Sequence, residues 1–139
     1  MSDPSAVGAV GPAEAWEILK TDPSAVLVDV RTAAEWQTIG VPVLDDLGKT
    51  PVFVPWQQVP GGPPNPDFVA ELQHNGVAAD ATVLFLCRSG VRSLAAAQLM
   101  SAHGFTRTIN VEEGFEGFPD ATGRRGTVNG WQAAGLPWR

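Results

Sequence analysis

Short apolar runs alternate along the chain with longer stretches in which apolar residues recur at helical spacing. Residues 25–30 form the first such run, Ala-Val-Leu-Val-Asp-Val, in which no polar residue appears before Asp29. An unbroken run of this kind is typical of a strand that is buried on both faces of a parallel sheet. Further runs predict strands at residues 52–54, 82–86 and 107–111.

The segments between these strands carry helix signals. Pro12 occupies a tolerated first-turn position in a helix predicted at residues 12–20. Thr32 and Glu35 form the Thr-x-x-Glu pattern of a capping box, which predicts the start of another helix. Three more helices are predicted, at residues 65–75, 93–103 and 130–136. Strands that alternate with helices predict an α/β fold with a mainly parallel central sheet and helices on both faces, and in such sheets functional sites form at the carboxyl ends of strands.

Composition narrows the classes of protein that fit this pattern. The length of 139 residues and the apolar content of 44% suit a single domain, residues 1–139. No apolar stretch approaches the roughly 18 residues of a membrane-spanning helix, and residues 1–12 lack the features of a signal peptide, so we expect a soluble, cytoplasmic protein. The net charge of −6 at pH 7 argues against nucleic acid or an anionic membrane as a partner. Any anion-binding site must therefore be local.

Cys87 is the single cysteine of the chain, which excludes an internal disulfide and the structural zinc patterns that need paired thiolates. His74 and His103 lie near predicted helix ends without a second ligand at metal spacing, so no metal site is expected. The Gly-Lys-Thr tripeptide at residues 48–50 lacks the earlier glycine of a phosphate-binding loop. A lone buried cysteine is more often packing than chemistry.

The loop that contains Cys87 reverses that expectation. Cys87 follows a buried apolar run and begins the sequence Cys-Arg-Ser-Gly-Val-Arg-Ser, residues 87–93, directly before a helix. Unpaired amides at a helix N-terminus and the positive end of its dipole form an anion-binding cup, and Gly90 permits a tight turn. Arg88 and Arg92 add positive charge. Helix N-termini and neighbouring cations lower the pKa of a cysteine, so we expect this side chain to be a thiolate at neutral pH.

Three segments resemble the single-domain rhodaneses, a sulfurtransferase family. They are Leu-Val-Asp-Val-Arg at residues 27–31 with the following Glu35-Trp36, the cysteine loop at 87–93, and Gly-Trp-Gln-Ala-Ala-Gly-Leu-Pro-Trp at 130–138. The resemblance spans nearly the whole chain, and the loop is its most specific part. It implies one rhodanese-like domain whose loop cysteine accepts a sulfane sulfur as a persulfide and passes it to a nucleophile. The chain departs from the family pattern at residues 38–51 and 119–128, which we expect to shape the rim of the site.

The residues and the resemblance together predict an enzyme of the thiosulfate sulfurtransferase type, with Cys87 as the nucleophile. The outer sulfur of thiosulfate, or of a similar small anionic donor, would pass to Cys87 and then to a thiol, to cyanide or to an acceptor protein. Arg88 and Arg92 are candidates for binding the anionic oxygens of the donor. The amides expected to hold the persulfide belong to Arg88, Ser89, Gly90, Val91, Arg92 and Ser93. No metal or organic cofactor is required.

Two other functions stay compatible with this loop. A cysteine phosphatase or arsenate reductase also cradles a tetrahedral anion, but its pattern places five residues between the cysteine and the arginine, whereas four separate Cys87 from Arg92. A binding or regulatory module could instead carry sulfur, or only the fold, to a partner without turnover of small donors.

Three charged residues near the end of the first predicted strand are candidate supporting residues. Asp29 could hold Arg92 or a loop amide, or it could pair with Arg31 in an ordinary buried salt bridge. Glu35 is more simply explained as the acid of the capping box.

Overall fold

The computed structural model of the chain describes residues 7–59 and 61–139. Within these ranges one sheet holds β1 (Gly8–Val10), β2 (Val26–Asp29), β3 (Val52–Phe53), β4 (Thr82–Leu86) and β5 (Arg107–Val111). All the pairings are parallel, in the order β1-β5-β4-β2-β3. The predicted parallel sheet is confirmed, and each of the four strands predicted from apolar runs is present.

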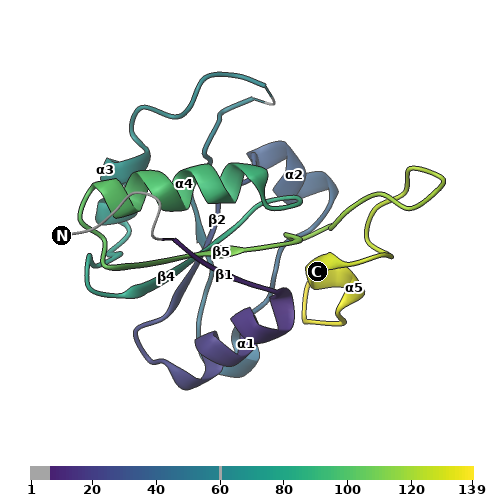
Figure 1. Cartoon of the computed structure of the whole chain (residues 1–139), viewed down its shortest axis with the longest axis horizontal. Coiled ribbons are helices and arrows are strands. Elements are labelled where there is room, and N and C mark those ends of the chain that lie inside the picture. The colour runs from purple at the N-terminus through teal and green to yellow at the C-terminus, as the bar shows by residue number, and fades with distance from the viewer. Residues whose placement is uncertain (1–6, 60) are drawn as a thin grey trace.

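Helices lie on both faces of the sheet (Figure 1). They are α1 (Pro12–Thr21), α2 (Ala33–Thr38), α3 (Phe68–His74), α4 (Val91–Ala102), α5 (Gly130–Ala133) and a short 3-10 helix at Asp45–Leu47. α3 and α4 bury one apolar core against the sheet, and α1 and α5 bury a second core against the opposite face. Two cores follow from strands that are apolar on both sides.

The central strand β4 lies between β2 and β5, and all five of its residues are buried. Because successive side chains of a strand point to opposite faces, Val83 and Phe85 join the core under α3 and α4, whereas Leu84 and Leu86 join the core under α1 and α5. Cys87 continues this alternation and belongs to the core of α3 and α4. The alternation therefore brings the cysteine to the face on which α4 lies.

Some helix boundaries differ from the predicted ones. α4 begins at Val91 rather than at residue 93, because Gly90 adopts a left-handed backbone (φ 106°) that lets the helix start at once. α3 begins at Phe68 rather than near Asn65, whose side-chain oxygen instead accepts from the Asp67 amide and closes a local turn. α5 is shorter than predicted.

No sequence signal predicts β1, because its three residues, Gly-Ala-Val, are too few to show a period. β1 nevertheless pairs with β5 along its whole length. The expected absence of a signal peptide concerns residues 1–12, of which residues 1–6 lie outside the described part of the chain. Among the residues that the structure does describe, no helix is long and apolar enough to cross a membrane.

Candidate active site

Cys87 lies at the carboxyl end of β4, in the loop that leads into α4. Its side chain is buried, with only 1% of the residue exposed. The Gly90 amide donates to its Sγ over 3.1 Å, and Ser93 Oγ lies 3.2 Å from Sγ. Of the loop residues selected from the sequence, the structure therefore brings Gly90 and Ser93 to the sulfur.

Asn110 is a residue of this site that sequence reasoning missed. It lies on β5, beside β4, and it accepts a hydrogen bond from Ser93 Oγ at its Oδ1 over 2.6 Å. Its Nδ2 donates to the Gly90 carbonyl over 3.2 Å. One buried amide thus holds two loop residues that contact Sγ of Cys87. The sequence did contain a signal for Asn110, because it is a polar residue between Ile109 and Val111, close to the carboxyl end of a predicted strand.

The turn that follows β5 fixes the loop through its carbonyl groups. The Phe115 amide donates to the Cys87 carbonyl over 2.8 Å, and the amides of Glu116 and Gly117 donate to the Arg88 carbonyl over 3.0 and 3.1 Å. The N–H and C=O of a trans peptide point in opposite directions. These hydrogen bonds therefore direct the N–H groups of the same two peptide units, those of Arg88 and Ser89, away from the turn that follows β5.

Gly114 allows this turn to approach the loop so closely. Its backbone is left-handed (φ 67°), and a Cβ added there would lie 2.5 Å from the carbonyl carbon and oxygen of Arg88 and 2.6 Å from the Cys87 oxygen. Real Cβ atoms do not come this near to main-chain atoms. A glycine is therefore required at this position if the loop is to keep its place.

Arg92 forms a bidentate ion pair with Glu35 of α2, in which Nη1 and Nη2 donate to the two carboxylate oxygens over 2.7 and 3.0 Å. Glu35 also completes a capping box with Thr32, as predicted. Burial of the Glu35 carboxyl opposes its ionisation, but hydrogen bonds from Arg92 and from the Thr32 amide outweigh burial and lower its pKa from 4.5 to about 2. Burial likewise lowers the pKa of Arg92, but its hydrogen bonds to Glu35 and the charge of that carboxylate raise it above its ordinary value. The pair is therefore fully charged at neutral pH.

Asp29 and Arg31, at the end of β2, form a completely buried salt bridge in which Arg31 Nη2 lies 2.8 Å from Asp29 Oδ2. Arg31 Nε also donates to Asp29 Oδ1 over 3.0 Å, and Nη2 donates to the Gly40 carbonyl over 2.9 Å. The guanidinium carbon lies 4.3 Å from the centre of the Phe115 ring. Of the two roles considered for Asp29, the structure shows the ordinary buried salt bridge with Arg31 rather than contact with Arg92 or a loop amide, and the guanidinium of this pair packs on Phe115 of the turn after β5.

Beside the loop lies a hollow of about 410 Å³ that both loop arginines line, here called the arginine hollow. The polar and charged residues of its lining include Thr32, Glu35, Gln57, Arg88, Arg92 and Glu116. The Arg88 side chain is exposed, whereas that of Arg92 is 20% exposed. Thr38 and Ile39 also line it, so the divergent segment 38–51 reaches the rim as expected, but residues 119–128 do not line it. Among the described residues, no cluster of three or more acidic, histidine or cysteine side chains could hold a metal ion.

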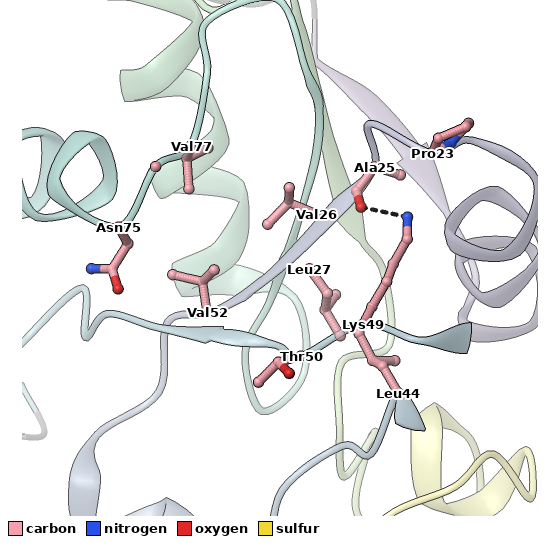
Figure 2. A pocket seen from close by; sticks show the side chains of 11 residues that line it. Pro23, Ala25, Val26, Leu27, Leu44, Lys49, Thr50, Val52, Asn75 and Val77 are labelled. Atoms are coloured by element: carbon pink, nitrogen blue, oxygen red, sulfur yellow. Dashed lines mark hydrogen bonds between the residues drawn. The ribbon is translucent and has the colours of Figure 1, made fainter. Parts of the chain in front are cut away.

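A different hollow, of about 260 Å³, lies where β2 and β3 begin (Figure 2). Cys87 follows the carboxyl end of the parallel strand β4, so this hollow lies at the opposite end of the sheet from Cys87. Lys49 of the rejected Gly-Lys-Thr tripeptide lines it. Its Nζ donates to the main-chain carbonyls of Asp22 and Ala25 over 2.8 and 2.7 Å. The lysine thus fixes the segment that leads into β2, and two of its three ammonium hydrogens are directed to main-chain carbonyls.

Proteins similar to this chain occur both among solved structures and among known sequences. The crystal structure of Rv0390 from M. tuberculosis has a TM-score of 0.86 and 47% sequence identity, and the match covers 96% of this chain and 97% of that one. A protein of Rickettsia conorii is 36% identical over 129 residues, which are 91% of this chain and 92% of its own length. The chloroplastic rhodanese-like domain-containing protein 4 of Arabidopsis thaliana is 27% identical over 136 residues, which are 97% of this chain and 26% of that protein.

The parallel sheet with helices on both faces, and the cysteine loop between its central strand and a helix, define a rhodanese-like α/β domain. This confirms the class that three short segments of the sequence indicated. The family model described as the STR4 middle domain matches residues 7–139, and the chain belongs to that family.

Proposed function

We propose that the protein is a sulfurtransferase that carries a sulfane sulfur on Cys87. The observation that carries this proposal is the placement of one buried cysteine at the end of β4, where the Gly90 amide donates to its Sγ and α4 begins four residues later. An amide and the N-terminus of a twelve-residue helix both favour negative charge on the sulfur. A sulfur held in this way can act as a nucleophile and can then retain a persulfide anion.

The chemistry proceeds in two displacements. In the first, the Cys87 thiolate attacks the outer sulfur of thiosulfate, a new S–S bond forms, and the S–S bond of thiosulfate breaks with its electron pair leaving on sulfite. In the second, cyanide or a thiolate attacks the outer sulfur of the Cys87 persulfide. The persulfide bond breaks and its electron pair returns to Cys87, which is again a thiolate. No external oxidant or cofactor enters, and the scheme is covalent ping-pong catalysis.

The two arginines of the loop take different parts in this scheme. Arg92 is held by Glu35, so it joins α4 to α2 and contributes a fixed charge near Cys87. Arg88 is exposed at the edge of the arginine hollow and is the group that attracts the anionic donor. The amides of the loop, with Ser93, then hold the transferred sulfur.

The loop geometry favours sulfur transfer over phosphoryl transfer. Four residues separate Cys87 from Arg92, one fewer than in the phosphatase pattern, and the Arg92 guanidinium faces Glu35 instead of forming a free ligand for a phosphoryl group. A tighter loop suits a single sulfur atom better than a tetrahedral phosphate.

The test is formation of thiocyanate from thiosulfate and cyanide, with Cys87→Ser as the control. Turnover that disappears in the variant supports the proposal. Intact-mass spectrometry of protein purified without reductant should show one added sulfur that Cys87→Ser lacks, at a mass accuracy that separates sulfur from two oxygens. Faster turnover of a phosphate ester than of thiosulfate would contradict the proposal. Partner binding that survives Cys87→Ser, without any turnover, would instead indicate the regulatory module.

A further inference from the structure

The cysteine loop also forms one wall of a second hollow, of about 520 Å³, here called the Phe118 groove. Ser89 and Gly90 of the loop line it, as does Asn110, which holds Ser93 in contact with Cys87. A molecule seated in this groove would contact Ser89 and Gly90, and the Gly90 amide donates to Cys87 Sγ. The groove and the arginine hollow therefore give two different approaches to the same loop.

The groove is unusually apolar for an exposed surface. Val91 is 77% exposed, Leu94 is 40% exposed and Phe118 is 51% exposed, and all three line it. Val91 and Leu94 stand three residues apart in the first turns of α4, so they share one side of the helix. Exposed apolar patches of this kind mark interaction sites when polar residues rim them.

The charge of the groove differs from that of the arginine hollow. The charged residues that line the groove are both acidic, Glu112 and Glu113, whereas the arginine hollow is lined by two arginines and two glutamates, Arg88, Arg92, Glu35 and Glu116. Glu113 is held in place, because its Oε1 accepts a hydrogen bond from the Gly130 amide. Glu112 is exposed. The groove therefore fits a partner that is cationic as well as apolar, and the net charge of −6 favours the same partner.

We propose that the Phe118 groove docks the sulfur acceptor, and that this acceptor is a protein segment with an apolar side chain beside a lysine or arginine and a reactive thiol. The proposal rests on the sulfurtransferase function proposed above. The acceptor thiolate attacks the outer sulfur of the Cys87 persulfide, so that an acceptor persulfide forms and the Cys87 thiolate is released. The small anionic donor approaches past Arg88 instead, so donor and acceptor do not compete for one surface.

Two peptide thiols of opposite charge test the groove. The first has the sequence Leu-Lys-Cys-Lys and the second Leu-Glu-Cys-Glu, both with blocked ends, and cyanide serves as an acceptor too small to need docking. The measured quantity is the second-order rate constant for sulfur transfer to each peptide, divided by the value for cyanide in the same variant. We expect the cationic peptide to be preferred. Phe118→Ser should lower the ratio of the cationic peptide to cyanide roughly fivefold. Glu112→Lys should reduce the preference for the cationic peptide over the anionic one by roughly threefold.

Matched changes elsewhere on the surface serve as controls. Val128, which is 55% exposed, and Glu17 on α1 do not line the groove, and Val128→Ser and Glu17→Lys should leave both ratios unchanged. If Phe118→Ser and Glu112→Lys change the ratios no more than these controls do, the docking proposal is wrong. Turnover with cyanide would still support the proposed sulfurtransferase function in that case. If the unaltered protein forms no thiocyanate and no persulfide, both proposals fail.

Discussion

Ser93 donates its hydroxyl hydrogen to Asn110 Oδ1 over 2.6 Å, while the same oxygen lies 3.2 Å from Cys87 Sγ. A serine hydroxyl has one hydrogen, so in this arrangement Ser93 has none to give to the sulfur. The contact with Sγ is then a hydrogen bond from the Cys87 thiol to Ser93. When Cys87 is a thiolate, the hydroxyl must rotate away from Asn110 to stabilise it. Asn110 and the sulfur thus compete for one hydrogen.

This competition predicts opposite effects for two alanine substitutions. Ser93→Ala removes the hydroxyl that can stabilise the thiolate, so alkylation of Cys87 by iodoacetamide at neutral pH should slow by roughly three- to tenfold. Asn110→Ala releases the Ser93 hydroxyl to the sulfur, so alkylation should accelerate by a similar factor. Rates of alkylation followed by intact mass measure both.

A double variant distinguishes this effect from simple loosening of the loop, since Asn110→Ala also removes the hydrogen bond to the Gly90 carbonyl. If the acceleration acts through Ser93, it should disappear when Asn110→Ala is made in the Ser93→Ala background. Acceleration that persists in the double variant would show that greater access to Cys87 causes it.

The sequence predicted the parts of this site that are contiguous along the chain and missed those that only the fold brings together. Strand β4, the loop and α4 follow one another, so the apolar run and the Cys-Arg-Ser-Gly-Val-Arg-Ser loop together located Cys87. Asn110 lies 17 positions from Ser93, and Glu35 lies 57 positions from Arg92. No local pattern reports such pairs, because strand order and helix placement decide them. The capping box did predict the conformation of Glu35, but it gave no sign of its ion pair with Arg92.

The ion pair between Glu35 and Arg92 predicts a pH dependence of stability. The pKa of Glu35 is lowered from 4.5 to about 2 in the folded protein. Its stabilising contribution is therefore complete above pH 4.5 and is lost as the pH falls from about 4.5 to 2. Glu35→Gln should cost about 1 to 2 kcal/mol at pH 7, and the difference between variant and parent should shrink near pH 3. Urea unfolding at both pH values measures it, and a difference that stays constant would contradict the assignment.

The close approach of Gly114 to the loop predicts that adding a single methyl group at this position greatly lowers stability. Gly114→Ala must place a methyl group 2.5 Å from the Arg88 carbonyl carbon and oxygen, in a left-handed backbone. Gly76 has a similar backbone (φ 78°) with nothing within 4 Å of an added Cβ, so Gly76→Ala isolates the cost of the backbone alone. We expect about 1 kcal/mol for Gly76→Ala and more than about 2 kcal/mol for Gly114→Ala. Only Gly114→Ala should also reduce thiocyanate formation, because it moves the carbonyls that orient the loop.

The exposed position of Arg88 predicts that its substitution weakens binding of the donor without changing the rate of the chemical steps. Arg88 is exposed at the arginine hollow, while Arg92 is held by Glu35, so of the two loop arginines Arg88 is the one placed to meet an anionic donor. Arg88→Ala should raise the KM for thiosulfate by roughly fivefold and leave kcat nearly unchanged, since the lost interaction is present before and during the reaction.

Added salt and two further substitutions test whether Arg88 acts through its charge. Arg88→Lys should restore part of the affinity, because a point charge replaces the planar fork. The effect of Arg88→Ala should diminish as added salt screens the attraction between exposed charges. Arg124, an exposed arginine that does not line the hollow, provides the matched control, and Arg124→Ala should leave the KM for thiosulfate unchanged. A fall in kcat with an unaltered KM would place Arg88 in the transition state instead of in donor capture.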